Sequence, residues 1–174
     1  LPEPLDEGNY DTIADITRDR MRRVAKRLRG TADLPNGQLG FRAFRLAPSA
    51  LPSWSEGLCA DADELAAKLE AQVSGPAPEI PSGDLLFEIQ ARAGVRLDRP
   101  VQVVEVQGFE AFDIDDGRLL LCLELSLNAG AVEAMLERQP QRLVLRESVF
   151  EGADAFRLEC VRWAERASVE LRTV

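Results

Sequence analysis

The chain has 174 residues, of which 45% are hydrophobic, and this is enough to bury one substantial core. No apolar run approaches the roughly 18 residues of a membrane span, and no charged and then apolar leader precedes a small-residue cleavage site, so the sequence predicts a cytoplasmic protein. The net charge of -9 argues against a general nucleic-acid binder, because affinity for a phosphate backbone depends on clustered positive charge.

The first predicted element is a basic helix within residues 11–29. This segment holds seven cations and three anions, a charge of +4, whereas residues 30–174 carry a charge of -10. Acidic residues stand in its first turn and cationic residues in its last, which suits the helix dipole, and Gly30 follows as a C-terminal cap. At about 100° per residue, one arc gathers apolar side chains that need burial, namely Ile13, Ile16, Met21, Val24 and Leu28.

The opposite face of this helix is cationic, and it carries Arg18, Arg22, Lys26 and Arg29. Two interpretations stay open for it: a solvated face, or contact with DNA phosphates. Arg20 differs, because it lies inside the apolar arc, where a guanidinium cannot be buried without a partner. We therefore expect Arg20 to form a structural or interface ion pair, with contact to a DNA phosphate or a cofactor carboxylate as the alternative.

Three further elements are predicted in the middle of the chain. Residues 40–46, with the sequence GFRAFRL, form a short strand that ends before Pro48. Residues 62–73 have helical spacing, and a connector rich in proline and glycine follows. Residues 83–93 form another helix, which ends at Gly94.

The last third of the chain has an α/β pattern. Residues 101–106 and 109–114 are predicted strands, followed by strands over 119–125, 143–145 and 169–171. Helices over 128–138, with Asn128 as the N-cap, and over 152–166 separate the last three strands. This β-α-β-α-β alternation predicts a small, mainly parallel sheet covered on both faces, with a β-hairpin before it.

Few residue groups in the chain could carry chemistry. Asp113, Asp115 and Asp116 do not have the spacing of a calcium loop, and Asp116-Gly117 favours a tight type I′ hairpin turn instead. The three cysteines are widely spaced and the chain has no histidine, so we expect buried thiols and no metal site. A phosphotransfer or hydrolase site at the strand ends has only Glu124, Arg146 and Glu147 as candidates.

Three stretches together resemble one known family. LPEP at residues 1–4, IADITRDRMRRV at 13–24 and GFRAFRLAPS at 40–49 are similar to the segment after the cofactor-binding motif in type III adenine-specific DNA methyltransferases, the modification subunits of restriction systems. The similarity continues more loosely to the C-terminus. The DPPY-type tetrapeptide and the F-x-G-x-G loop of that family do not occur in this sequence, and it begins at Leu1 without methionine, so we expect a C-terminal fragment that is inactive alone.

The resemblance implies a fold, a cofactor and partners. Residues 1–50 would be the end of a Rossmann-like methyltransferase sheet, a helix plus a strand, and residues 51–174 an appended α/β interaction domain. S-adenosylmethionine would be the cofactor of the parent protein, with none bound to this fragment, and DNA the substrate. The implied protein partners are a second modification subunit in a homodimer and a restriction subunit.

Glu3 is the candidate for cofactor binding that the resemblance offers. An acid at this place would lie near the ribose of S-adenosylmethionine, and the alternative is a turn carboxylate exposed to water. The chain departs from the family at Ala47, where members often have an acidic residue.

A second hypothesis has no enzymatic parent. It describes a stand-alone α/β module for oligomerisation or as an adaptor, and it predicts that the apolar face around Ile13 is covered within this chain. A fragment of a larger sheet should instead leave Ile13, Ile16 or Phe41 uncovered, or covered by another chain.

Overall fold

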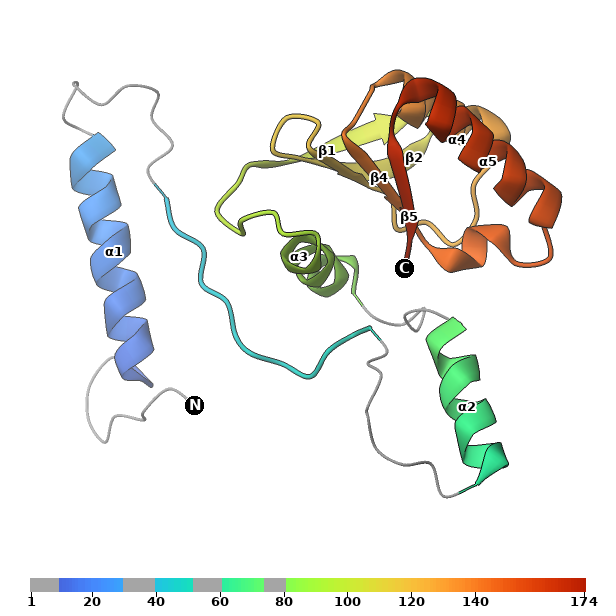
Figure 1. Cartoon of the computed structure of the whole chain (residues 1–174). Helices are drawn as coiled ribbons and strands as arrows, with labels where there is room; N and C mark the ends of the chain where they lie inside the picture. The colour runs from blue at the N-terminus through green and yellow to red at the C-terminus, as the bar shows by residue number, and fades with distance from the viewer. Residues whose placement is uncertain (1–9, 30–39, 52–60, 74–80) are drawn as a thin grey trace. The chain divides into compact units, whose positions relative to one another are not determined.

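The computed structural model describes residues 10–29, 40–51, 61–73 and 81–174 (Figure 1). The chain divides into two units, Leu1–Ala47 and Pro48–Val174, and each is described by itself. Within the described ranges no helix has both the length and the apolar character needed to cross a membrane.

The second unit is built on one open sheet of five strands in the order β1-β2-β3-β4-β5. The strands are β1 (Val101–Val106), β2 (Phe109–Ile114), β3 (Leu119–Leu121), β4 (Arg142–Leu145) and β5 (Glu170–Thr173). β1, β2 and β3 pair antiparallel, whereas β4 pairs parallel with both β3 and β5. The predicted α/β class is confirmed, and the sheet is mixed because the hairpin strands belong to it.

Helices cover both faces of this sheet (Figure 1). Helices α4 (Ala129–Glu137) and α5 (Asp154–Ala167) lie on one face, and α3 (Ser82–Arg92) lies on the other. A short 3₁₀ helix, Glu147–Phe150, follows β4. The predicted helices over 83–93, 128–138 and 152–166 are therefore confirmed, although the last begins two residues later than expected.

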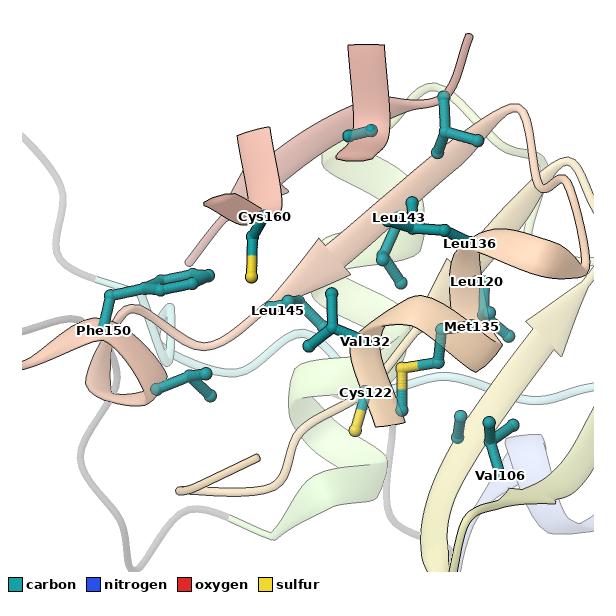
Figure 2. Close-up of a cluster of buried hydrophobic side chains, with 14 residues drawn as sticks. Val106, Leu120, Cys122, Val132, Met135, Leu136, Leu143, Leu145, Phe150 and Cys160 are labelled. Atoms are coloured by element: carbon teal, nitrogen blue, oxygen red, sulfur yellow. The ribbon is translucent and has the colours of Figure 1, made fainter. Parts of the chain in front are cut away.

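β3 supplies side chains to both cores. Leu120 packs with Val132 and Met135 of α4 (Figure 2), and Leu119 and Leu121 pack in the cluster that contains α3. All three leucines are at most 1% exposed. Because successive side chains of a strand alternate between faces, a strand buried on both sides must be apolar at every position. Each leucine contributes on the order of 1.5 to 3 kcal/mol by burial.

Both hairpin turns use backbone with positive φ. Gln107 and Gly108, which join β1 to β2, have φ values of 54° and 85°, and Asp116 and Gly117, which join β2 to β3, have values of 52° and 86°. The Asp113 carboxylate accepts a hydrogen bond of 2.7 Å from the Gly117 N–H. The predicted Asp116-Gly117 turn is confirmed. The turn between β1 and β2 was not predicted, because Gln107 is not a residue that typically begins such a turn.

The buried cysteines agree with the sequence prediction. Cys122 and Cys160 are free thiols that are fully buried in the core between the sheet and helices α4 and α5 (Figure 2). Burial raises the pKa of each thiol to about 11, since a thiolate is poorly solvated in an apolar environment. Cys59 lies outside the described residues.

Two strand predictions need correction. Residues 40–46 are not a strand, because they have no ladder partner among the described residues and their side chains are exposed. The strand expected over 119–125 covers only Leu119–Leu121, and the chain turns away from the sheet after Cys122 bonds to the Val144 carbonyl. The helix predicted over 62–73 is confirmed as α2 (Ala62–Val73).

We expect Asn128→Ala to lower the free energy of unfolding of the second unit by about 1 kcal/mol. The Asn128 side chain accepts a hydrogen bond of 2.8 Å from the Ala131 N–H, and alanine leaves that donor without its partner at the start of α4. Urea unfolding followed by circular dichroism measures the change. Asn128→Asp keeps an acceptor and should be nearly neutral, so equal losses in both variants would contradict the capping role.

Candidate functional site

The first unit contains α1 (Ile13–Arg29), which is the predicted basic helix. Thr12 and Asp15 begin it with a reciprocal pair of hydrogen bonds. The Asp15 N–H donates to the Thr12 hydroxyl oxygen at 3.2 Å, and that hydroxyl donates to the Asp15 carboxylate at 2.6 Å. The Thr12 bond, with the nearby Arg18 guanidinium, holds the pKa of Asp15 below its ordinary value. These bonds satisfy a backbone donor that a helix start leaves open.

A second polar network ties the residues before α1 to its middle. The Tyr10 hydroxyl donates to Asp19, and the Arg23 guanidinium lies 2.7 Å from the same carboxylate. The Tyr10 bond, followed by Arg23, lowers the pKa of Asp19, while the same bond raises the pKa of Tyr10. Asp19 thus links Tyr10 to Arg23, and it forms an ion pair with only one of the cations on the helix.

The four predicted phosphate contacts differ in their surroundings. Arg18 forms an ion pair with Asp15 and is one-third exposed. Arg22, Lys26 and Arg29 are all exposed. Arg22 and Lys26 form no ion pair with another described residue, whereas Arg29 is not free of interactions. Arg22 and Lys26 are four residues apart, so they lie on one side of α1 and can reach neighbouring phosphates. Whether these side chains contact DNA stays a prediction.

The apolar face of α1 is open. No residue of the helix is buried, and four large apolar side chains are 39% to 48% exposed, namely Ile13, Met21, Val24 and Leu28. Arg20 is also exposed and pairs with no carboxylate within the described ranges, so its predicted ion pair stays a prediction. An amphipathic helix gains most of its stability in a protein by burying its apolar face, and the other described residues of the first unit leave this face largely exposed.

The segment after α1 has the same character. Phe41 and Phe44 are 37% and 47% exposed, in a stretch of chain without a strand partner among the described residues. Glu3, the predicted cofactor contact, lies outside the described residues. Among its described residues, the first unit therefore presents a basic helix face and two sets of exposed apolar side chains.

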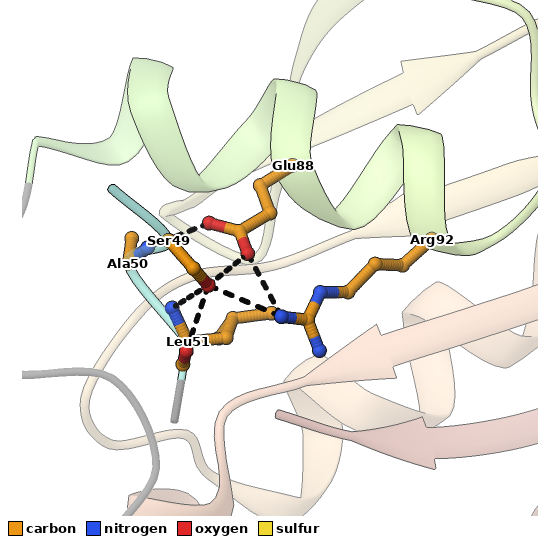
Figure 3. A network of polar contacts seen from close by, with 5 residues as sticks. All are labelled: Ser49, Ala50, Leu51, Glu88 and Arg92. Carbon is orange, nitrogen blue, oxygen red and sulfur yellow. Dashed lines mark hydrogen bonds and ion pairs between the residues drawn. The ribbon is translucent and has the colours of Figure 1, made fainter. Parts of the chain in front are cut away.

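A polar network fixes the start of the second unit to α3 (Figure 3). Glu88 accepts a hydrogen bond of 2.8 Å from the Ala50 N–H, another from the Ser49 hydroxyl, and lies 3.0 Å from the Arg92 guanidinium. Partial burial works to raise the pKa of Glu88, but these three bonds outweigh it and lower the pKa below its ordinary value. Leu51 is consequently held in the core beside α3.

The outer edge of β1 is the second candidate surface. The two-residue turn makes Val106 and Phe109 a hydrogen-bonded pair, so alternate residues of β1 direct their N–H and C=O groups away from β2. Val103 is one of these, and its side chain is 64% exposed. No other described segment pairs with this edge. An uncovered edge with valines is a surface on which another strand can add.

At the strand ends, two of the three candidates for the alternative catalytic site lie in structural surroundings, and the catalytic role stays a prediction. Glu147 pairs with Arg157 at 2.5 Å, and Arg146 is 5% exposed. Asp115 lies 3.6 Å and 3.7 Å from two arginines, which fits its place in the hairpin turn. In the part of the chain that the structure describes, no group of acidic or cysteine side chains could hold a metal ion.

Comparison with known proteins gives no family for this chain: no protein-family model matches it, and no curated protein matches it.

We expect Tyr10→Phe to raise the pKa of Asp19, because the hydroxyl bond is the largest influence that lowers it. A carboxylate whose pKa is lowered by folding stabilises the fold above its unfolded pKa, and this contribution is lost as the pH falls through the folded pKa. Loss of α1 order on acidification should therefore begin at higher pH in the variant. Carboxyl carbon shifts of Asp19 and amide shifts of α1, recorded by NMR during an acid titration, measure both effects.

Thr17→Val is the matched control for this prediction. Thr17 is an exposed residue of the same helix, and its hydroxyl bonds to the Ile13 carbonyl rather than to Asp19. The control should therefore leave the Asp19 titration as it is in the unmodified chain. An unchanged Asp19 titration in Tyr10→Phe would contradict the network.

Proposed function

We propose that this chain is the C-terminal region of an S-adenosylmethionine-dependent adenine-specific DNA methyltransferase of a restriction-modification system, resembling the type III modification subunits. The parent protein transfers a methyl group to the exocyclic amino group of adenine in the cytoplasm. The chain itself serves subunit association and assembly of the DNA complex. The sequence stretches at residues 1–4, 13–24 and 40–49 carry the resemblance.

One structural observation supports this proposal over a stand-alone module. The apolar face of α1 is open, and the exposed phenylalanines Phe41 and Phe44 follow in a segment without strand pairing among the described residues. In the proposed parent, the helix and the segment after it would lie against a larger sheet that covers them. A self-contained adaptor would be expected to cover Ile13 with its own residues.

The basic face of α1 fits the same proposal. Arg22 and Lys26 stand exposed on a helix whose charge is positive, although the chain as a whole carries -9. Affinity for DNA depends on the local field at the phosphates, so a basic helix can contact DNA while an acidic domain stays away from it. In the proposed parent this helix contacts DNA phosphates and makes no base-specific contacts.

The second unit supplies the association surface in this proposal. β1 presents backbone groups at an uncovered edge, and Val103 is the most exposed of the valines there. Two copies of β1 can pair antiparallel about Val103, which places Glu105 of one copy opposite Val101 of the other and brings no like charges together. The sheet would then continue from one subunit into the next.

The methyltransferase proposal is tested on the complete open reading frame that contains this chain. We expect it to encode a DPPY-type tetrapeptide and an F-x-G-x-G loop before Leu1, and its product to transfer tritiated methyl groups from S-adenosylmethionine to adenine in DNA. The 174-residue chain alone should give only background incorporation. A reading frame without these motifs, or a product that methylates no DNA, would refute the proposal.

The basic face gives that experiment a matched pair of variants. Arg22→Ala with Lys26→Ala should weaken DNA binding by the complete protein and reduce the salt dependence of log K by about 1.8, roughly 0.9 for each phosphate that is no longer neutralised. Arg162→Ala with Arg166→Ala removes two exposed cations from α5 and should leave the slope unchanged. Equal effects of the two pairs would show that α1 does not contact DNA.

For the association surface, we expect Val103→Lys to weaken self-association of the chain roughly tenfold or more, because a lysine at an edge strand opposes pairing with another strand. Val103→Thr keeps a β-branched side chain without charge and should associate as the unmodified chain does. Sedimentation velocity over a concentration series measures both. A chain that is monomeric at every concentration, or a lysine variant with unchanged association, would exclude β1 as the interface.

A further inference from the structure

A hollow of about 430 Å³ lies on the α3 face of the sheet, between the C-terminal end of α3 and strands β4 and β5. Its apolar lining includes Leu51, Ile89, Val144 and Val174. α3 is the one described helix packed in this core. The hollow lies next to the C-terminal end of α3, on the side of the edge strand β5. The volume is within the range of pockets that hold small molecules.

Arginines from three separate elements line the same hollow: Arg92 of α3, Arg142 of β4 and Arg172 of β5. The strand register explains why two of them meet here. Arg172 is the partner of Val144, and Arg142 is two residues before Val144 on its strand, so both side chains belong to the α3 face. Arg92 reaches the hollow from the last turn of α3.

Two side-chain carboxylates lie beside these three cations. Glu170 lies 2.8 Å from Arg142 and 2.7 Å from Arg172, so one carboxylate serves two guanidinium groups. Glu88 serves Arg92. Two side-chain carboxylates thus serve three guanidinium groups.

The arginines also retain hydrogen-bond donors. Arg92 uses Nη2 for Ser49 and Glu88, Arg142 uses Nε and Nη1 for Glu170 and the Ala93 carbonyl, and Arg172 uses Nε and Nη2 for Glu170. The remaining terminal nitrogen of each guanidinium has no bond to another described residue. A guanidinium has five N–H donors, and its planar geometry suits a carboxylate or a phosphate.

We propose that this hollow binds a small amphipathic anion, in which an apolar group rests on Leu51, Ile89 and Val144 and a carboxylate or phosphate meets the arginines. A purely ionic ligand fits less well, because it would leave the apolar lining without contacts. A neutral ligand also fits less well, since the guanidinium donors would lose water without gaining a charged acceptor. This site does not depend on the proposed methyltransferase function.

The test uses the complete 174-residue chain and four probes: benzoate, phenyl phosphate, neutral benzamide and inorganic phosphate. Methyl NMR shifts of Ile89, Val144 and Val174 follow binding. We expect saturable shifts with benzoate or phenyl phosphate, and the stronger of the two identifies the acidic group. Benzamide and inorganic phosphate should each bind about tenfold more weakly or not at all, because each lacks one of the two required parts.

Arg172→Gln is the variant that should weaken the stronger probe about tenfold. Its side chain is 67% exposed, so the fold does not depend on it. Arg166→Gln, an exposed position on α5, is the control and should bind normally. Arg92→Gln removes a second positive charge from the hollow, this time from α3, and should also weaken binding. The proposal is overturned if no probe saturates the shifts, if benzamide binds as well as benzoate, or if both arginine variants bind as the unmodified chain does.

Discussion

The second unit depends on the burial of β3 on both of its faces. Leu119 and Leu121 point into the core with α3, and Leu120 points into the core with α4 and α5. Neighbouring strands on both sides of β3, antiparallel β2 and parallel β4, complete its backbone bonding. A polar side chain at any of the three positions would lie in one of the two cores without water. The helices on both faces of the sheet pack against this strand. Ser49 and Leu51 depend on it as well, because they are held by α3.

The first unit lacks a comparable source of stability among its described residues. α1 has no buried residue, so its order rests on local contacts such as the Thr12–Asp15 cap and the Asp19–Arg23 pair. Such pairs contribute only a few tenths of a kcal/mol each, and an isolated helix of this length is marginal in water. The exposed apolar arc would add several times more if it were covered. Cover for the apolar arc of α1, from this chain or from another, would therefore stabilise the helix more than its local contacts do.

The sequence predicted most elements of the second unit because their signals are local. Asn128 begins α4, Asp116-Gly117 closes a hairpin, and the apolar run from Leu119 indicates a buried strand. The prediction of a strand at 40–46 was wrong. A strand needs a hydrogen-bonded neighbouring strand, and the alternation of apolar and polar residues does not show whether one is present. The hollow beside α3 could not be predicted either. Arg92, Arg142 and Arg172 are far apart in the sequence, and only the sheet register and the packing of α3 bring them together.

Net charge describes this protein poorly, because seven cations lie along α1 and three arginines meet at the hollow. Along α1, Asp15 and Asp19 pair with Arg18 and Arg23, and the helix holds five more cations, Arg22 and Lys26 among them. At the hollow, Arg142 and Arg172 share the carboxylate of Glu170. Charges more than about 10 Å apart are screened at moderate salt, so the field at a ligand depends on the charges nearest to it and not on the net charge. Residues 30–174 carry a charge of -10, which opposes binding of a polyanion, so we expect contact with DNA phosphates at α1 and binding of small anions only at the hollow.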